Sequence, residues 1–237
     1  MNIAVIPARG GSKRIVRKNI RDFCGSPMLG WPISTALACG VFDRIIVTTD
    51  DAEVAALALA LGAEVPFMRP DELATDTTAT VPVIRHAITE LAAKPNDLIC
   101  CIYPTAAFMQ VADLQQASKI VVSGNADFVM PVTAYSSPLS RALQLSVEGR
   151  LSMCMPEFVS SRTQDCTTFY HDVGHFYLGR AAAWQSELDF YQRQVKAVLI
   201  PKYRAHDIDT QEDWEYAEML FSCLQKKIGS AGSCIND

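Results

Sequence analysis

A basic, glycine-containing segment lies near the start of the chain, at residues 7–14 (PARGGSKR). It directly follows a short apolar run. Two adjacent glycines within it allow the backbone to approach a ligand closely and to turn its N–H groups inward, while the side chains around them add charge and donors. Binding a triphosphate requires this chemistry. The residues that we expect to contact the phosphates are Arg9, Gly10, Gly11, Ser12 and Lys13.

The spacing of this segment excludes two common phosphate-binding fingerprints. Neither G-x-x-x-x-G-K-[ST] nor G-x-G-x-x-G occurs in it. The alternative is a surface turn whose basic side chains are simply solvated. However, residues 9–18 carry five cations in a chain with a net charge of −5, and they follow a predicted strand. Because open α/β sheets bind ligands at the C-terminal ends of their strands, we favour a phosphate-binding loop.

Two aspartates, Asp207 and Asp209, are separated by one apolar residue in the sequence HDID. In an extended segment both carboxylates would point to the same side. Two like charges held close together favour a cation between them, and oxygen ligands beside a phosphate substrate suit Mg²⁺. Asp209 or Thr210 could instead cap a helix that begins near Gln211, and the pattern alone does not decide. A phosphate-binding loop elsewhere in the chain favours the magnesium site.

The histidines and cysteines give weaker indications of a metal site. His171 and His175 would face one side of a regular strand, but no third ligand follows nearby. The eight cysteines contain no C-x-x-C pair, and the adjacent Cys100 and Cys101 would point to opposite faces of a strand. We therefore predict neither a zinc site nor a disulfide framework, and we interpret most cysteines as small buried residues.

Alternating apolar and helix-period segments predict an α/β fold. Asp50 or Asp51 could cap an alanine-rich helix that ends before Gly62. The alternation indicates a largely parallel, doubly wound central sheet flanked by helices. In this part of the chain the expected strands lie at residues 3–7, 44–49, 64–67, 97–103 and 127–132. Besides the alanine-rich helix, helices are expected at residues 30–39, 81–93 and 111–123. Such a sheet would gather four loops at the edge where ligands bind, at residues 9–19, 49–51, 68–80 and 104–108.

The second half of the chain interrupts this alternation. Residues 134–168 are rich in loops, with short strand-like pieces, and this excursion could pack on a partner subunit. We predict a single domain over residues 1–227 and a flexible C-terminal tail over residues 228–237. Regular elements then return, with strands expected at residues 169–178 and 195–200 and helices near residues 180–190 and 211–227.

The composition limits the class of protein. A chain of 237 residues, 49% hydrophobic and 20% charged, is long enough for a core and is not disordered. No apolar run approaches the roughly 20 residues of a membrane span, and no signal peptide is recognisable, so we expect a soluble, cytoplasmic protein without a membrane partner. The acidic net charge argues against a nucleic-acid-binding protein.

Five segments, taken in order, resemble one known family. They are IPARGGSKR with the following RKN, FDRIIVTTDD, VPFMRPDELATDTT, the YPTA turn and HDIDTQEDW. Over nearly its whole length, the chain resembles the sugar-acid cytidylyltransferases, the family of the CMP-sialic acid synthetases. The resemblance implies a Rossmann-like nucleotidyltransferase fold and a homodimer whose central excursion reaches over the partner's site. It also implies a Mg²⁺-dependent reaction of CTP with a 2-keto sugar acid, giving a CMP-sugar and pyrophosphate.

Individual roles follow from the same resemblance. Asp207 and Asp209 would bind the metal, and Arg9, Lys13 and Asp209 would be the catalytic residues. Where the family usually has proline, this loop has a valine at position 16; because proline only fixes φ, the change should alter stiffness rather than chemistry. The triphosphate loop would comprise Arg9, Ser12, Lys13 and Asn19, and the nucleoside pocket Arg69, Thr78 and Thr80.

Further motifs resemble one branch of the family, the pseudaminic acid cytidylyltransferases. They are R-x-Q-D at residues 162–165 and Y-H-D-x-G-x-F-Y at residues 170–177. His171 stands where sialic-acid activators usually carry arginine. Arginine offers a carboxylate two parallel hydrogen bonds, and histidine cannot do so. His175 departs even from this branch, in which glutamine is commoner. The implied sugar-acid-binding residues are Tyr103, Arg162, Gln164, His171, His175 and Tyr177.

The resulting hypothesis is transfer of a cytidylyl group from CTP to pseudaminic acid, for surface glycans or flagellin glycosylation. The nearest alternative is the same chemistry on N-acetylneuraminic, legionaminic or 3-deoxy-octulosonic acid. Two further alternatives are a guanylyl- or adenylyltransferase with a similar loop and a non-catalytic nucleotide-binding protein on the same fold. The general base stays open among Asp209, a metal-bound water and His171.

Overall fold

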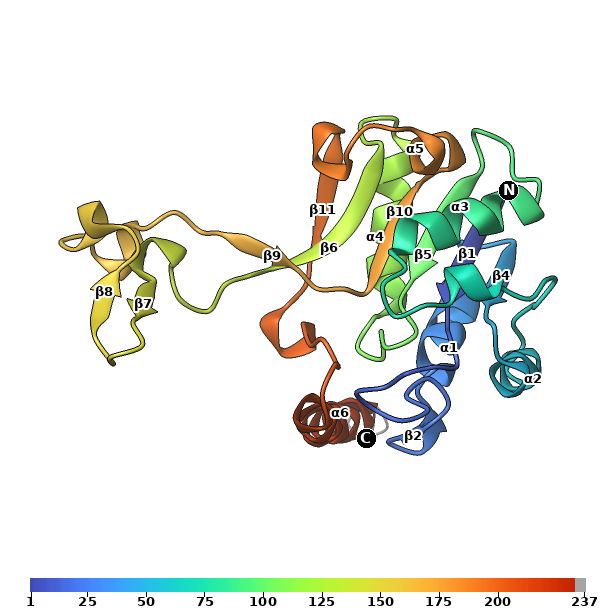
Figure 1. Cartoon of the computed structure of the whole chain (residues 1–237), viewed down its shortest axis with the longest axis horizontal. Coiled ribbons are helices and arrows are strands. Elements are labelled where there is room, and N and C mark those ends of the chain that lie inside the picture. Colours follow the sequence, from blue (N-terminus) through green and yellow to red (C-terminus); the bar gives the residue numbers. More distant parts are fainter. Residues whose placement is uncertain (233–237) are drawn as a thin grey trace.

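A mixed seven-stranded sheet forms the centre of the protein (Figure 1). The computed structural model describes residues 1–232, and the side chains of residues 1–226. The strand order is β11-β6-β10-β5-β1-β4, and β9 also pairs with β6. The strands of this sheet are β1 (Asn2–Pro7), β4 (Arg44–Thr48), β5 (Leu98–Ile102), β6 (Phe128–Ala134), β9 (Tyr170–Asp172), β10 (Phe176–Arg180) and β11 (Val195–Leu199).

Five of the seven strands of this sheet run in the same direction, which confirms the predicted fold class. β1 is parallel to β4 and β5, and β11 is parallel to β6. β10 is the exception, because it runs antiparallel to both of its neighbours, β5 and β6; the short β9 is also antiparallel to β6. The reversed direction of β10 places its first residue at the edge where the parallel strands end. The segment before β10 therefore joins the loops that follow those strands.

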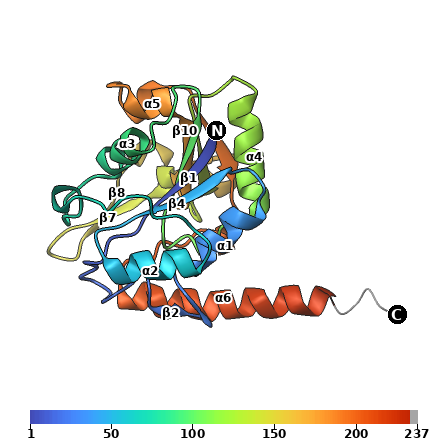
Figure 2. The ribbon, with the colours of Figure 1, turned by 90° about the vertical axis from the view of Figure 1, so that its right-hand side faces the viewer.

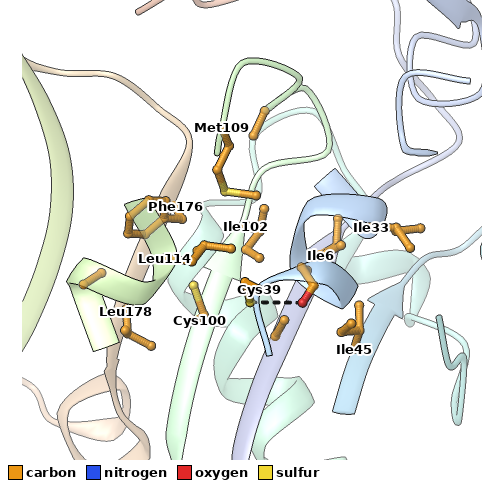
Figure 3. Packing of buried hydrophobic residues seen from close by; sticks show 14 of the residues in the cluster. Ile6, Ile33, Cys39, Ile45, Cys100, Ile102, Met109, Leu114, Phe176 and Leu178 are labelled. Carbon is orange, nitrogen blue, oxygen red and sulfur yellow. Dashed lines mark hydrogen bonds between the residues drawn. The ribbon is translucent and has the colours of Figure 1, made fainter. Parts of the chain in front are cut away.

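Helices cover both faces of the sheet, because each strand alternates its buried side chains. In β1, Ile6 belongs to one buried cluster and Val5 to the other; Cys100 and Cys101 of β5 divide in the same way, as predicted. Side chains of α1, α2 and α4 fill the first cluster (Figure 3), and those of α3 and α5 the second. These helices are α1 (Gly30–Ala38), α2 (Ala52–Ala60), α3 (Thr80–Glu90), α4 (Val111–Val122) and α5 (Ala181–Gln185).

Local signals explain several boundaries of these elements. The Asp51 carboxylate caps α2 by accepting the N–H groups of Glu53 and Val54 at 2.9 and 3.0 Å. The strand expected at residues 64–67 is reduced to one bridge, because Pro66 lacks the N–H that would extend the pairing. The predicted helix at residues 180–190 is only α5. Single 3₁₀ turns are η1 (Asp71–Leu73), η2 (Leu139–Arg141), η3 (Pro156–Phe158), η4 (Thr163–Asp165), η5 (Phe190–Gln192) and η6 (Lys202–Arg204).

The long helix α6 (Gln211–Gly232) lies along one end of the molecule (Figure 2). Trp214 and Phe221 of α6 pack on Phe23, with ring centroids 5.2 and 5.3 Å apart. Phe23 belongs to a small hairpin of β2 (Asp22–Phe23) and β3 (Ser26–Pro27). The helix extends past its predicted end at residue 227, and the rest of the predicted flexible tail, residues 233–237, lies outside the described residues. Among the described helices, none is both long and apolar enough to span a membrane.

Residues 135–169 form an arm that projects from the body of the protein (Figure 1). Its tip carries a hairpin of β7 (Leu143–Leu145) and β8 (Leu151–Met153). Leu143, Leu145 and Leu151 are each more than half exposed. The arm coincides with the excursion predicted at residues 134–168. Such a cluster of exposed apolar side chains is typical of a protein–protein contact surface.

The strand expected over residues 169–178 is broken into β9 and β10. Between them Gly174 has φ of +69°, and its N–H donates to Asp172 Oδ1 at 2.8 Å, which closes a turn. The regular strand on which His171 and His175 would have faced one side is therefore not formed.

The prediction that most cysteines are buried is also wrong. Among the seven described cysteines, all of which are free, Cys39, Cys100 and Cys101 are buried. Cys154 and Cys223 are exposed, because the arm and the outer side of α6 are not covered by other parts of the chain.

A buried ion pair between Arg204 and Asp113 joins η6 to α4. Arg204 Nη1 lies 2.5 Å from Asp113 Oδ2, and Nη2 lies 3.0 Å from Oδ1. Both side chains are more than nine-tenths buried. The pair therefore anchors the segment that leads to Asp207.

We expect Arg204→Met to lower the free energy of unfolding by roughly 3–5 kcal/mol, because it leaves the Asp113 carboxylate buried without its partner. Urea denaturation followed by circular dichroism measures this loss. Arg44→Met, which breaks the more exposed pair with Glu64, is the control and should cost about 1 kcal/mol or less. A loss for Arg204→Met as small as that of the control would contradict the prediction.

Candidate active site

A cleft of about 550 Å³ opens at the edge where the parallel strands end. Because β1, β4 and β5 are parallel neighbours, three of the loops expected at this edge lie together, and only the loop at residues 49–51 is missing from the lining. Five segments contribute to the lining: the loop after β1, residues 69–83, residues 103–105 after β5, residues 172–177 from the end of β9 into β10, and residues 207–209 before α6.

The loop after β1 supplies most of the basic side chains of the cleft. Asn19 braces this loop, since its Nδ2 donates to the Arg9 carbonyl oxygen at 2.9 Å and the residue is only 5% exposed. The four side chains that were assigned to triphosphate binding, Arg9, Ser12, Lys13 and Asn19, all line the cleft.

The two glycines of the loop do not line the cleft, in contrast to their predicted role. The Gly10 N–H donates to Asp50 Oδ1 at 3.0 Å, so it is directed toward the loop after β4. A Cβ atom on Gly10 would lie 2.6 Å from the Cβ atom of Asp51, which is too close, so only glycine fits at this position. Gly10 thus permits the close packing of two loops, while Gly11 lies in open space.

A carboxylate from another loop binds two of the predicted phosphate-binding cations. Asp76 Oδ1 lies 2.6 Å from Arg9 Nη1, and Asp76 Oδ2 forms an ion pair with Lys13. Hydrogen bonds from Lys13 and Arg9 lower the pKa of Asp76, so it is ionised at neutral pH. Arg9 and Lys13 are therefore already arranged around an anionic group.

Asp207 and Asp209 both line the cleft, and the fully buried Ile208 between them turns both carboxylates to one side. Desolvation, followed by the charge of Asp209, raises the pKa of Asp207. Asp209 Oδ1 lies 2.8 Å from Arg14 Nη2 and 3.4 Å from Lys18 Nζ. The two acidic groups thus repel each other across the same part of the cleft.

This pair of carboxylates fits a hard divalent cation. Oxygen ligands suit Mg²⁺, which is usually held by one or two carboxylates together with substrate phosphates. No group of three potential ligands clusters anywhere in the described part of the chain, so the protein would contribute these two. Neither is needed to cap α6, because Thr210 Oγ1 accepts the Asp213 N–H at 3.2 Å.

Arg69 lies deep in the cleft and is only 5% exposed. Burial is the main cause that lowers its pKa to about 10, and the charge of Arg9 also lowers it. Arg69 remains a cation at neutral pH, and it donates to the carbonyl oxygen and the hydroxyl of Thr48 at the end of β4. Thr78 and Thr80 line the same part of the cleft.

Hydroxyl groups and one carboxylate, from residues 80, 103, 172 and 177, form a polar wall of the cleft. Thr80 Oγ1 and Tyr103 OH lie 2.9 Å apart, and the Tyr103 and Tyr177 rings meet edge to face with centroids 5.8 Å apart. The Tyr177 hydroxyl donates to Asp172. Tyr103 and Tyr177, both expected to bind a sugar acid, therefore belong to one continuous polar wall.

Four residues expected to bind the sugar acid do not line this cleft. His175 is 1% exposed, and burial lowers its pKa to about 4, so it is a neutral core residue. His171 packs on Tyr135 at the base of the arm and lines a separate cavity of about 350 Å³. Arg162 and Gln164 belong to the arm, which projects from the body (Figure 1), and neither lines the cleft.

Four charged residues of the cleft were missed in the sequence. They line it, although none was assigned a role: Arg14, Lys18, Asp76 and Asp172. Each falls inside a segment that carries the family resemblance, so the motifs themselves contained the signal. Only the folded chain shows that these side chains, rather than their neighbours, face the cleft.

The sheet order, the basic loop after its first strand and the acidic pair define a nucleotidyltransferase-type α/β enzyme. The fold is similar to that of a solved CMP-2-keto-3-deoxy-manno-octonic acid synthetase complexed with CTP, with a TM-score of 0.69 and 18% identity, covering 93% of this chain and 98% of that one. Residues 3–148 match the cytidylyltransferase family model. The chain belongs to the cytidylyltransferase family.

Two curated relatives extend the similarity over nearly the whole chain. A pseudaminic acid cytidylyltransferase of Campylobacter jejuni is 36% identical over 222 residues, covering 93% of this chain and 96% of the relative. A CMP-N,N'-diacetyllegionaminic acid synthase of Legionella pneumophila is 30% identical over 236 residues, covering 95% and 98%. The protein is accordingly an enzyme of the nucleotidyltransferase class.

We expect Asp76→Asn to strengthen the binding of inorganic triphosphate by roughly threefold to tenfold, the scale of two exposed ion pairs. The reason is that the anion must displace Asp76 from Arg9 and Lys13. Isothermal titration calorimetry at low ionic strength measures the change. Asp71→Asn, in the exposed 3₁₀ turn of the same loop, is the control and should leave binding unchanged. Weaker binding in Asp76→Asn would show that this carboxylate assists the anion instead of competing with it.

Proposed function

We propose that the enzyme joins CTP to pseudaminic acid, giving CMP-pseudaminic acid and pyrophosphate. The observation that carries this proposal is the cleft, in which one cavity combines a basic loop, two carboxylates and a wall of hydroxyl groups. The 36% identity to the C. jejuni pseudaminic acid cytidylyltransferase supports this choice of acid. The Y-H-D-x-G-x-F-Y motif at residues 170–177 supports the same branch.

The reaction is a displacement at the α-phosphorus of CTP. The anomeric hydroxyl oxygen of the acid forms the new P–O bond, the bond to pyrophosphate breaks, and the hydroxyl proton is released. Arg9 and Lys13 would bind phosphate oxygens in exchange for the carboxylate of Asp76. Because His171 lies outside the cleft, a cleft carboxylate such as Asp209 is the better candidate to accept the proton. Positioning and charge neutralisation dominate such transfers.

Asp207 and Asp209 would hold Mg²⁺, which neutralises charge on the phosphate oxygens when it is bound. Arg14 and Lys18 would keep the Asp209 carboxylate at the edge of the cleft, since both pair with it. The cytidine would lie against residues 69–80, where Arg69 holds the end of β4 and the hydroxyls of two threonines line the cleft.

The same chemistry on legionaminic acid is the second candidate, supported by the 30% identity to the L. pneumophila synthase. Pyrophosphate release separates the two. The assay uses CTP and Mg²⁺ with pseudaminic, legionaminic, N-acetylneuraminic and 3-deoxy-octulosonic acids in parallel, and GTP and ATP replace CTP in further reactions. Preference for pseudaminic acid and CTP is expected. Preference for another acid would overturn the substrate, and CTP binding without any release would favour a non-catalytic nucleotide-binding protein.

We expect Asp209→Asn to remove most turnover while the fold and CTP binding persist, because the substitution removes one of two acidic metal ligands. Pyrophosphate release at saturating Mg²⁺ measures turnover, and calorimetry measures CTP affinity. Glu212→Gln, an exposed residue of the first turn of α6 outside the cleft, is the control and should behave as wild type. Near-normal turnover in Asp209→Asn would refute the metal assignment.

We also propose a homodimer in which the arm of one protomer reaches the cleft of its partner. The exposed leucines of the arm support this arrangement, because an apolar tip of this kind is stabilised by contact with another surface. It would also give Arg162 and Gln164 a cleft to act on, since neither lines its own. In this arrangement they contact the sugar acid from the partner's side.

Complementation between inactive variants tests this arrangement. Arg162→Ala and Asp209→Asn should each be inactive alone, but co-expressed chains should recover about a quarter of wild-type activity. Half of the random dimers are mixed, and each mixed dimer has one cleft with both intact residues. No recovery, although mixed dimers are isolated with two different affinity tags, would show that Arg162 does not act in the partner's cleft.

The reaction would take place in the cytoplasm, where CTP is made. Its activated product would then supply a glycosyltransferase that modifies flagellin or builds a surface glycan.

A further inference from the structure

The cleft contains a carboxylate that belongs neither to the phosphate-binding loop nor to the proposed metal-binding pair. Asp172 lines the polar wall, and its Oδ1 accepts the Gly174 N–H at 2.8 Å while its Oδ2 accepts the Tyr177 hydroxyl. Both donors are neutral, so the negative charge of Asp172 is fixed in place without being neutralised. Each oxygen also keeps a lone pair for a further donor.

The sheet order separates this carboxylate from the cationic part of the cleft. Asp172 precedes β10, which lies two strands away from β1, so about 10 Å separates the strand ends that carry the two sites. The basic loop follows β1, and the salt bridges of Arg9 and Lys13 are made with Asp76. Asp172 therefore lies apart from the ion pairs that surround the basic loop.

Aromatic packing holds the partner of Asp172 in place. The Tyr177 ring packs edge to face on Tyr103 and on Phe190, with both centroid distances at 5.8 Å. Burial, followed by the hydrogen bond to Asp172, raises the pKa of Tyr177, so its hydroxyl stays a donor throughout the physiological range. The hydrogen bond from Tyr177 therefore orients the Asp172 carboxylate.

On the basis of the proposed function, we infer that Asp172 is a specificity-determining residue that accepts a hydrogen bond from a hydroxyl or amide N–H group of the sugar acid. A nonulosonic acid carries its carboxylate next to the anomeric carbon and its acylamino groups further along the chain. Asp172 repels the carboxylate and attracts these donors. The acid is thus oriented with its anomeric hydroxyl toward the triphosphate and its N-acyl groups toward the wall.

Asp172→Asn tests this role, because asparagine keeps an acceptor for the Gly174 N–H but removes the charge. We expect the KM for pseudaminic acid to rise at least tenfold, the scale of one hydrogen bond to a charged group, with CTP affinity within about twofold of wild type. The preference for pseudaminic acid over 3-deoxy-octulosonic acid, which has no acylamino group, should fall as well. Tyr177→Phe, which frees the carboxylate from its hydroxyl partner, should shift both quantities in the same direction by a smaller factor.

Two results would overturn the inference. The first is an unchanged preference between the two acids. The second is an equal loss of activity with both acids together with weaker CTP binding, because that combination indicates a merely structural role. If Asp172→Asn does not fold, Tyr177→Phe alone decides, with the same readouts. Turnover of pseudaminic acid by the wild-type enzyme is established first. If the wild type is active, a negative result with the variants counts against the role of Asp172 alone. An inactive wild type would count against the proposed function as well.

Discussion

The concentration of positive charge in residues 9–18 is the constraint on which the cleft depends. Five cations in one loop would repel each other, and each is paired with a carboxylate from a distant part of the chain. Asp76 pairs with two of them, Asp209 with two others, and Asp51 with Arg17 at 2.5 Å. These pairs tie the loop to the segments after β4 and before α6. The same electrostatic balance therefore shapes the loop and prepares it to exchange carboxylate for phosphate.

The sheet makes this balance possible. The loops that carry the opposite charges lie far apart in sequence, and only the parallel pairing of β1 with β4 and β5 brings their ends to one edge. Gly10 contributes by allowing the first loop to touch Asp51 directly. The reversed strand β10 then adds a segment that enters the cleft from the other direction. The turn before it, at Gly174, brings Asp172 and Tyr177 into contact and so adds a polar wall to the cleft.

Local patterns in the sequence were sufficient to predict the framework of helices and strands. The alternation in β1, the Asp51 cap of α2 and the side chains of Arg9 and Lys13 depend on near neighbours in the chain, whose periodicity and hydrogen bonding the sequence contains. The acidic pair was equally visible, because one buried residue between two aspartates defines their common side. Residues 134–168 were recognised as an excursion because their pattern departs from the α/β alternation.

Contacts between distant segments were decided only by the tertiary structure. Whether Asp76 pairs with the basic loop, and whether Asp172 faces the cleft while His171 and His175 do not, depends on one turn at Gly174 and on loops that are many residues apart. The direction of β10 and the position of Arg162 outside the lining of its own cleft are likewise set by packing. The sequence alone therefore determined the elements and the chemistry of single loops, because these depend on local periodicity and side-chain type. The tertiary structure decided which charges meet, because Coulombic pairing and burial depend on distances that the chain order does not contain.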